Sequence, residues 1–289
     1  MKTKTMKKII RAKVDEWLAS IDDGHVKDLA RKNTIVTGGA IASMLLNEPV
    51  NDFDIYFRTA AAAEAVANYY VARFHRETGH PLALDVKDGR IRITTSSGHR
   101  GETVGAIETL GSEEIDDAYE QAEEKALNTE DDGKPPYRPV FLSTNAITLS
   151  RKVQIIVRFY GEPDAIHENY DFVHCTNYWT SWEDSLVLRQ PALEALLAKE
   201  LRYVGSKYPV CSIIRLRKFI KRGWTINAGQ ILKAVMQISE LDLSDPKVLE
   251  DQLTGVDSAY FMQLMTQLKE KDPEKVNAAY LVEIIDRMF

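Results

Sequence analysis

The sequence predicts an α+β protein, in which a mixed-sheet domain over about residues 1–190 precedes an all-helical domain over residues 191–289. Short alternating apolar segments separated by turns recur through the first domain, as in β-strands. A strongly helix-forming stretch that starts at Ala60 follows one of these strands and would form the crossover that a mixed sheet needs. From Pro191 onward, the apolar residues recur at helical spacing.

The first element is expected to be an amphipathic helix, because its apolar residues recur at helical offsets. They are Ile10, Val14, Trp17, Leu18 and Ile21. Further along, alternation predicts a hairpin over residues 82–93 and strands over 140–142, 146–149, 153–159 and 170–174, with a short helix over 163–167.

A short strand, a glycine turn, a small helix and a second strand follow one another between residues 33 and 57. Ile35 and Val36 form the first strand, Gly38 and Gly39 interrupt it, and apolar residues at helical spacing follow at once. The second strand is Phe53 to Phe57, in which apolar and polar residues alternate.

Asp52 and Asp54 are two residues apart and therefore share a face of the second strand, toward the glycine turn. Two adjacent carboxylates repel unless a cation lies between them, and Mg²⁺ binds carboxylate and phosphate oxygens. The amides of Gly38 and Gly39, at a helix N-terminus, can receive phosphates. Together these residues predict a seat for a metal ion and a triphosphate.

This order of a Gly-Gly turn, a short helix and an Asp-x-Asp strand resembles the nucleotidyltransferase superfamily, which includes DNA polymerase beta, poly(A) polymerases and CCA-adding enzymes. The match is closest to the bacterial CCA-adding type, in which a Leu-Leu pair like Leu45-Leu46 precedes Asp-x-Asp-Ile. The resemblance implies a nucleotidyltransferase domain that uses two Mg²⁺ ions and a nucleoside triphosphate (NTP). A dinucleotide-binding Rossmann unit is the competing interpretation, but Ala42 and Ser43 occupy the places of its later glycines.

A third carboxylate is needed to bind the second cation and activate the attacking hydroxyl. Asp171 and Asp85 are the candidates on predicted strands. We favour Asp171, because the run from Val153 to Phe172 resembles nucleotidyltransferase-like proteins in which such a strand supplies this acid. Asp85 lies in a hairpin close to a turn, where acids are common for conformational reasons alone.

The helical half contains a basic stretch, in which Arg215 and Lys218 share one polar helix face. The stretch resembles the neck helix of CCA-adding enzymes, which implies nucleotide contacts from these residues and an RNA or tRNA 3′ end as acceptor. A solvated surface helix is the alternative. The Glu-Asp-x-x-Arg base-reading signature of that family is absent, since Arg189 falls two places too late after Glu183 and Asp184.

Other features bound the interpretation. An acidic insertion is expected over about residues 98–139, and the formal net charge of −6 provides no general basic field for nucleic acid. No long apolar run or signal-peptide core appears, so we expect no membrane partner and a cytoplasmic location. Two alternative functions remain open: nucleotidylation of a protein, small molecule or tRNA in the manner of toxins and antitoxins, and a degenerate fold that only binds.

Overall fold

The computed structural model describes residues 1–79, 82–87, 89–95, 134–142 and 145–243, with 245, 248, 251 and 252. These residues form two compact units. The described part of the first unit lies within residues 1–168 and 174–196, and that of the second within 169–173 and 197–252. The predicted domain boundary after residue 190 stays a prediction.

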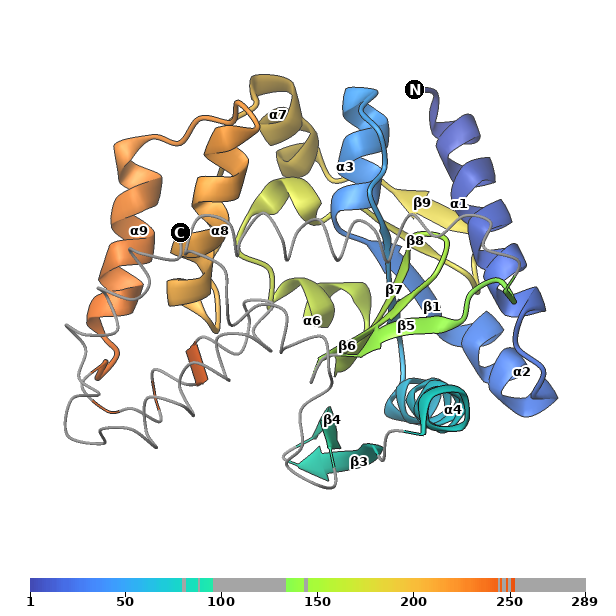
Figure 1. Cartoon of the computed structure of the whole chain (residues 1–289). Helices are drawn as coiled ribbons and strands as arrows, with labels where there is room; N and C mark the ends of the chain where they lie inside the picture. Colours follow the sequence, from blue (N-terminus) through green and yellow to red (C-terminus); the bar gives the residue numbers. More distant parts are fainter. Residues whose placement is uncertain are drawn as a thin grey trace. The chain divides into compact units, whose positions relative to one another are not determined.

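The first unit is built on a seven-stranded mixed sheet with the order β5-β6-β7-β2-β1-β8-β9 (Figure 1). The strands are β1 (Thr34–Thr37), β2 (Phe53–Phe57), β5 (Pro139–Leu142), β6 (Ala146–Leu149), β7 (Val153–Tyr160), β8 (Tyr178–Thr180) and β9 (Ser185–Val187). β2 and β7 pair in parallel, and the other neighbours pair antiparallel. Strands β1 and β2 therefore lie in the interior of the sheet, with β7 beside β2 and β8 beside β1.

Helices α1 (Thr3–Ala19), α2 (Gly24–Asn33) and α4 (Ala60–Thr78) share one hydrophobic core with the sheet. The apolar stripe of α1 is buried, and Trp17 donates a hydrogen bond from Nε1 to the Tyr70 hydroxyl of α4 at 2.8 Å. α3 (Gly39–Leu46) links β1 to β2, and α6 (Pro163–His167) follows β7. The shared core thus packs β1 and β2 against these helices.

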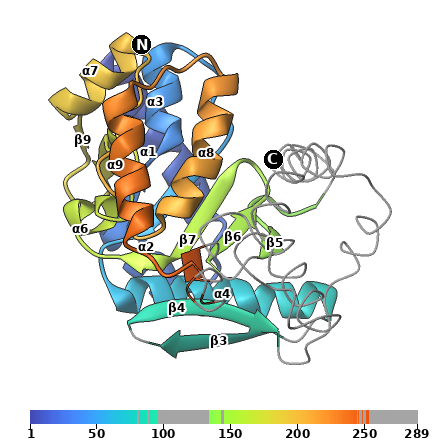
Figure 2. The ribbon, with the colours of Figure 1, turned by 90° about the vertical axis from the view of Figure 1, so that its left-hand side faces the viewer.

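β3 (Leu82–Lys87) and β4 (Arg90–Thr95) form a separate two-stranded sheet beside α4 (Figure 2). The hairpin is antiparallel and pairs Asp85 with Arg92. The predicted hairpin is therefore confirmed, and it lies outside the seven-stranded sheet.

In the second unit, α8 (Pro209–Lys221) and α9 (Ala228–Ser239) lie side by side (Figures 1 and 2). Aromatic rings pack beneath α8: Phe172 contacts Tyr203 and Phe219, with ring centroids 6.0 and 5.6 Å apart. Trp224 continues this cluster against Phe219. Helix α7 (Gln190–Ala198) belongs to the first unit up to Leu196, and its last two residues belong to the second.

The mixed sheet and the helices after residue 190 confirm the predicted α+β class. The strand expected over 170–174 is wrong, because Phe172 makes only an isolated bridge to Tyr203 and a 3₁₀ turn, Val173–Cys175, follows. Strands β8 and β9 were not anticipated. The acidic stretch from 98 to 133 lies outside the described residues. Within the described part of the chain, no helix is long and apolar enough to span a bilayer.

Candidate functional site

The glycine turn joins the end of β1 to the start of α3. Gly38 is the N-cap of α3 and has φ 86° and ψ −147°, a conformation that side-chain-bearing residues rarely adopt. Its N–H donates to the Cys175 carbonyl at 3.1 Å, so this amide is engaged within the protein. Gly39 is exposed, and a Cβ added there would meet no atom within 4 Å. Gly38 therefore sets the turn, whereas Gly39 faces open space at the positive end of the helix.

The two predicted carboxylates lie at the start of β2, in the same unit as the turn. The strand register pairs Asp54 with Thr37, the residue immediately before Gly38. Asp52 directly precedes the strand, and both aspartates are half-buried. Antiparallel pairing of two short strands thus brings Asp54 opposite the beginning of the glycine turn, although 16 positions separate Gly38 from Asp54 in the sequence.

The donor set suits a hard divalent cation. Mg²⁺ in proteins is commonly held by one or two carboxylates together with phosphate oxygens of a substrate, and Asp52 and Asp54 offer such carboxylates. Over the part of the chain that the structure describes, no group of three or more His, Cys, Asp or Glu side chains gathers as a metal site would. The residues therefore fit an ion that is completed by substrate phosphates rather than a closed protein cage.

Asp171 and Arg215, predicted to act on the metal and on the nucleotide, form an ion pair with each other in the second unit. Arg215 Nε donates to Asp171 Oδ2 at 2.7 Å, and the Asp171 side chain is 14% exposed. Lys218 lies one turn further along α8, at the spacing that places it on the same helix face as Arg215. The convergence of Asp171 with Asp52 and Asp54 stays a prediction.

The alternative third carboxylate, Asp85, is exposed on the β3–β4 hairpin, opposite Arg92. It lies outside the seven-stranded sheet that carries β2.

A buried network that spacing alone did not reveal holds the residue before the turn. Thr37 Oγ1 lies 2.8 Å from His167 Nε2, 2.9 Å from the Asn177 carbonyl and 3.2 Å from the Cys175 carbonyl. Because carbonyls only accept and a hydroxyl carries one proton, Thr37 donates to a carbonyl and His167 Nε2 donates to Thr37. Burial lowers the pKa of His167 to about 4, which keeps this imidazole neutral.

Arg189 extends this network along the strand beside β1. Its main-chain N–H donates to Asn177 Oδ1 at 2.8 Å, its guanidinium lies over the Tyr178 ring at 5.4 Å, and it forms an ion pair with Asp164. Tyr178 is paired with Thr37 in the sheet. The Arg189 guanidinium therefore lies over a residue of β8, the strand that pairs with the end of β1. The only sequence signal was an arginine displaced from an expected motif.

Asp184 belongs to the Glu183-Asp184 pair that begins the incomplete base-reading signature. Its carboxylate contacts side chains of the protein itself. It accepts hydrogen bonds from Arg11 Nε at 3.0 Å and from Trp179 Nε1 at 3.1 Å, and Lys7 Nζ is 3.0 Å from its other oxygen. The carboxylate thus ties α1 to the β8–β9 hairpin, which explains an acid at this position without base recognition.

Comparison with protein families gives a match to Gad2, described as Gabija anti-defense 2 family protein, over residues 8–199. This match covers about two thirds of the chain. The chain belongs to the Gad2 family. The matched range includes the glycine turn, Asp52 and Asp54, and it ends before α8.

A curated relative, "Gabija anti-defense 2" of Bacillus phage SPbetaL7, is 20% identical over 256 residues, which are 88% of this chain and 49% of the relative. This Gad2 chain therefore spans about half the length of the curated relative that it matches.

Solved structures similar to this Gad2 chain include a Thermotoga maritima CCA-adding enzyme complexed with tRNA, at 16% identity and a TM-score of 0.39, covering 90% of this chain and 56% of that one. A tRNA-processing enzyme with CTP is 12% identical, with a TM-score of 0.40 and coverage of 90% and 57%.

Proposed function

We propose that this Gad2 protein is a Mg²⁺-dependent nucleotidyltransferase, which transfers a nucleoside monophosphate from an NTP to a hydroxyl acceptor and releases pyrophosphate. The observation that carries the proposal is the register of β1 and β2, which sets Asp54 opposite the residue before the Gly38–Gly39 turn. A carboxylate beside a helix N-terminus is the combination that a metal-bound triphosphate requires.

Each residue has a definite part in this mechanism. The amides at the start of α3, at and after Gly39, receive triphosphate oxygens, while Gly38 keeps the turn in shape. Asp52 and Asp54 hold two Mg²⁺ ions, which neutralise charge on the phosphates and lower the pKa of the attacking hydroxyl when they are bound. Asp171 is the third carboxylate, which would bind the catalytic cation and help activate the acceptor hydroxyl for in-line attack on the α-phosphate.

Positive charge from α8 completes the nucleotide contacts. Arg215 and Lys218 would bind phosphates of the nucleotide or of the acceptor backbone. Arg215 Nε also donates a hydrogen bond to Asp171 Oδ2, which joins the basic helix face to the proposed third carboxylate. Because these residues form a basic helix face, an RNA or tRNA 3′ end is the first acceptor that we propose.

A second acceptor is favoured by the family. The name Gabija anti-defense 2 implies that family members counteract a defence system called Gabija, and nucleotidylation of a protein or nucleic acid of that system would achieve this. The acidic net charge of −6 and the structural use of Asp184 agree better with an acceptor that is not read base by base.

The chemistry is tested by incubating the full chain with each α-labelled NTP, Mg²⁺, and either tRNA or the purified proteins of the Gabija system. We expect label in one acceptor with stoichiometric pyrophosphate, and a loss of at least about 100-fold for Asp54→Asn and Asp52→Asn. Asp28→Asn is the matched control, because Asp28 is an exposed aspartate on α2. Full activity of Asp54→Asn would overturn the catalytic proposal.

The acceptor arms separate the two candidates. Label that enters only tRNA supports the RNA 3′-end reaction, whereas label that enters only Gabija components supports direct modification. A third result distinguishes a binding protein: if Asp54→Asn still protects phage against Gabija in cells and no acceptor is ever labelled, the fold acts without catalysis.

A further inference from the structure

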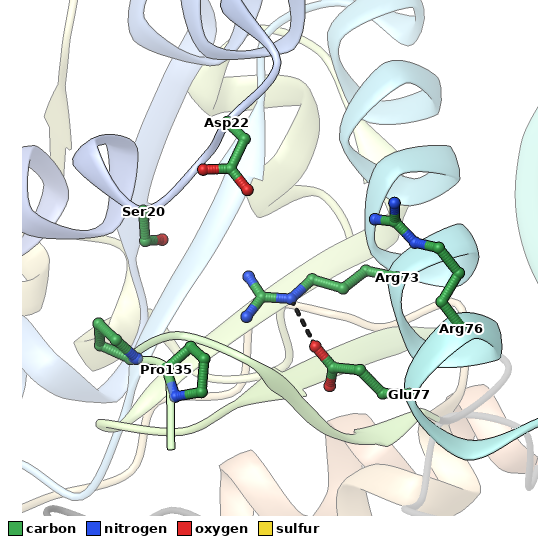
Figure 3. A pocket seen from close by; sticks show the side chains of 7 residues that line it. Ser20, Asp22, Arg73, Arg76, Glu77 and Pro135 are labelled. Atoms are coloured by element: carbon green, nitrogen blue, oxygen red, sulfur yellow. Dashed lines mark hydrogen bonds and ion pairs between the residues drawn. The ribbon is translucent and has the colours of Figure 1, made fainter. Parts of the chain in front are cut away.

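A cavity of about 510 Å³ lies in the first unit, and none of its lining residues belongs to the candidate site described above. Its walls come from the end of α1, the C-terminal part of α4 and the segment before β5. The lining residues are Ser20, Asp22, Arg73, Arg76, Glu77, Pro135 and Pro136 (Figure 3). The volume falls in the range of small-molecule sites, roughly 300–1,000 Å³, and exceeds what a bare inorganic ion needs.

Arg73 supplies the main recognition group of this cavity. Its side chain is only 11% exposed, and Glu77 accepts a hydrogen bond from its Nε at 2.8 Å. The guanidinium extends from α4 toward the space between Ser20, Asp22 and Pro135 (Figure 3). Since Glu77 engages Nε, the two terminal nitrogens form the leading edge of the guanidinium. A planar pair of N–H donors in this setting matches the two oxygens of a carboxylate or phosphate.

The wall opposite Arg73 carries Asp22, which favours a hydrogen-bond donor on the ligand. The Asp22 carboxylate faces the same space as the Arg73 guanidinium (Figure 3), and an anion alone would be repelled by it. A hydroxyl or ammonium group would instead donate to Asp22. Pro135 and Pro136 add an apolar wall, and with two arginines and two acids the formal charge of the lining is balanced.

We propose that this cavity binds a small organic oxyanion, a phosphate ester or carboxylate that also carries a hydroxyl or ammonium group. Arg73 holds the oxyanion in a bidentate manner, Glu77 orients Arg73, and Asp22 accepts from the hydroxyl or ammonium group. The site is separate from the glycine turn and the Asp52–Asp54 pair, so the proposal does not depend on the nucleotidyltransferase activity.

Isothermal titration calorimetry of the full chain, in buffer without divalent cations, tests the site with three probes. AMP presents a phosphate ester with hydroxyls, glutamate presents a carboxylate with an ammonium group, and inorganic phosphate presents the oxyanion alone. We expect one of the two organic probes to bind at one site, more tightly than inorganic phosphate. The organic probe that binds shows whether the oxyanion of the ligand is a phosphate ester or a carboxylate.

Variants attribute the binding to the cavity. Arg73→Gln should weaken the organic probe about tenfold or more, and Arg73→Lys, which keeps the charge but loses the fork, should also weaken it. Arg31→Gln, at an exposed arginine of α2, is the control for net charge. Asp22→Asn should raise the affinity for inorganic phosphate and lower the preference for the organic probe. Circular dichroism checks that each variant is folded.

Asp54→Asn keeps this proposal apart from the proposed function, because it should leave cavity binding unchanged. Absence of saturable binding by all three probes up to about 10 mM would overturn the proposal, since such a site would be weaker than roughly 3 kcal/mol of binding free energy. Equal affinities for the wild type and both Arg73 variants would overturn it as well.

Discussion

Replacement of His167 by glutamine should flatten the pH dependence of stability in the acid range. His167 is 6% exposed, and its pKa is lowered to about 4, mainly by burial and also by the charge of Arg189, while Asp164 opposes the change. In the unfolded chain, a histidine binds its proton near pH 6.5. Between these two values the unfolded state binds more protons, so stability falls as the pH falls. The loss amounts to about 3 kcal/mol between pH 7 and pH 4.

Urea unfolding of the wild type and His167→Gln at pH 7, 6, 5 and 4.5 measures this effect. Glutamine retains an N–H donor for the Thr37 hydroxyl but does not titrate. The constant cost of the altered packing appears at every pH, and only the pH-dependent part of the difference reports the buried imidazole. We expect the wild type to lose its advantage progressively below pH 6.5. His25→Gln, at an exposed histidine of α2, should follow the wild type.

A difference between the wild type and His167→Gln that stays constant from pH 7 to pH 4.5 would refute the reasoning. It would mean that the imidazole takes up its proton in the folded state as readily as in the unfolded one.

Five further substitutions test other parts of the structure. Gly38→Ala should lower the free energy of unfolding by about 1–3 kcal/mol in urea unfolding, because the backbone conformation of Gly38 is strained for alanine. Gly39→Ala should leave stability nearly unchanged, because a Cβ there meets no atom, but it should weaken NTP binding in calorimetry. Asp184→Ala should lower the free energy of unfolding by about 1–3 kcal/mol, since it leaves a buried indole N–H without its acceptor, and should leave NTP binding intact. Asp171→Asn should abolish nucleotidyl transfer and Asp85→Asn should not; the reverse result in the labelling assay would exchange their roles.

Periodicity succeeded where local sequence and tertiary burial agree. The stripe of α1 is buried as its spacing predicts, with Met6, Ile10 and Trp17 each at 0% exposure. The order of β1, the glycine turn and β2 was also readable, because a strand, two glycines and an alternating pattern are local signals.

The same reasoning failed at residues 170–174, where aromatic and β-branched residues suggest a strand. There, Phe172 packs edge-to-face on Phe219, and the chain turns into a 3₁₀ segment rather than pairing along a sheet. Strands β8 and β9 have only three residues each, too few to show a period. Their hairpin is held by Asp184, whose partner Arg11 is 173 positions away, and no spacing rule reports such a contact.

In the candidate site, too, the sequence predicted the parts that depend on local order and missed those that depend on long-range contacts. Asp54 and the glycines follow from local order, but the Thr37–His167 pair joins residues 130 positions apart. Arg189 was noticed only as a misplaced motif residue. Both became informative once the sheet had brought β1 and β8 together.

The strand order has a consequence for synthesis of the protein on the ribosome. β1 and β2 emerge early, but the strands that flank them, β7 and β8, are translated much later. Until residue 160 has left the exit tunnel, both sides of this two-stranded ribbon present unpaired backbone groups, a template for aberrant association. The β1 side stays unpaired until residue 180 has also emerged. Fragments that stop before Val153 should therefore depend on chaperones and should not hold the glycine turn against Asp54 in its native register.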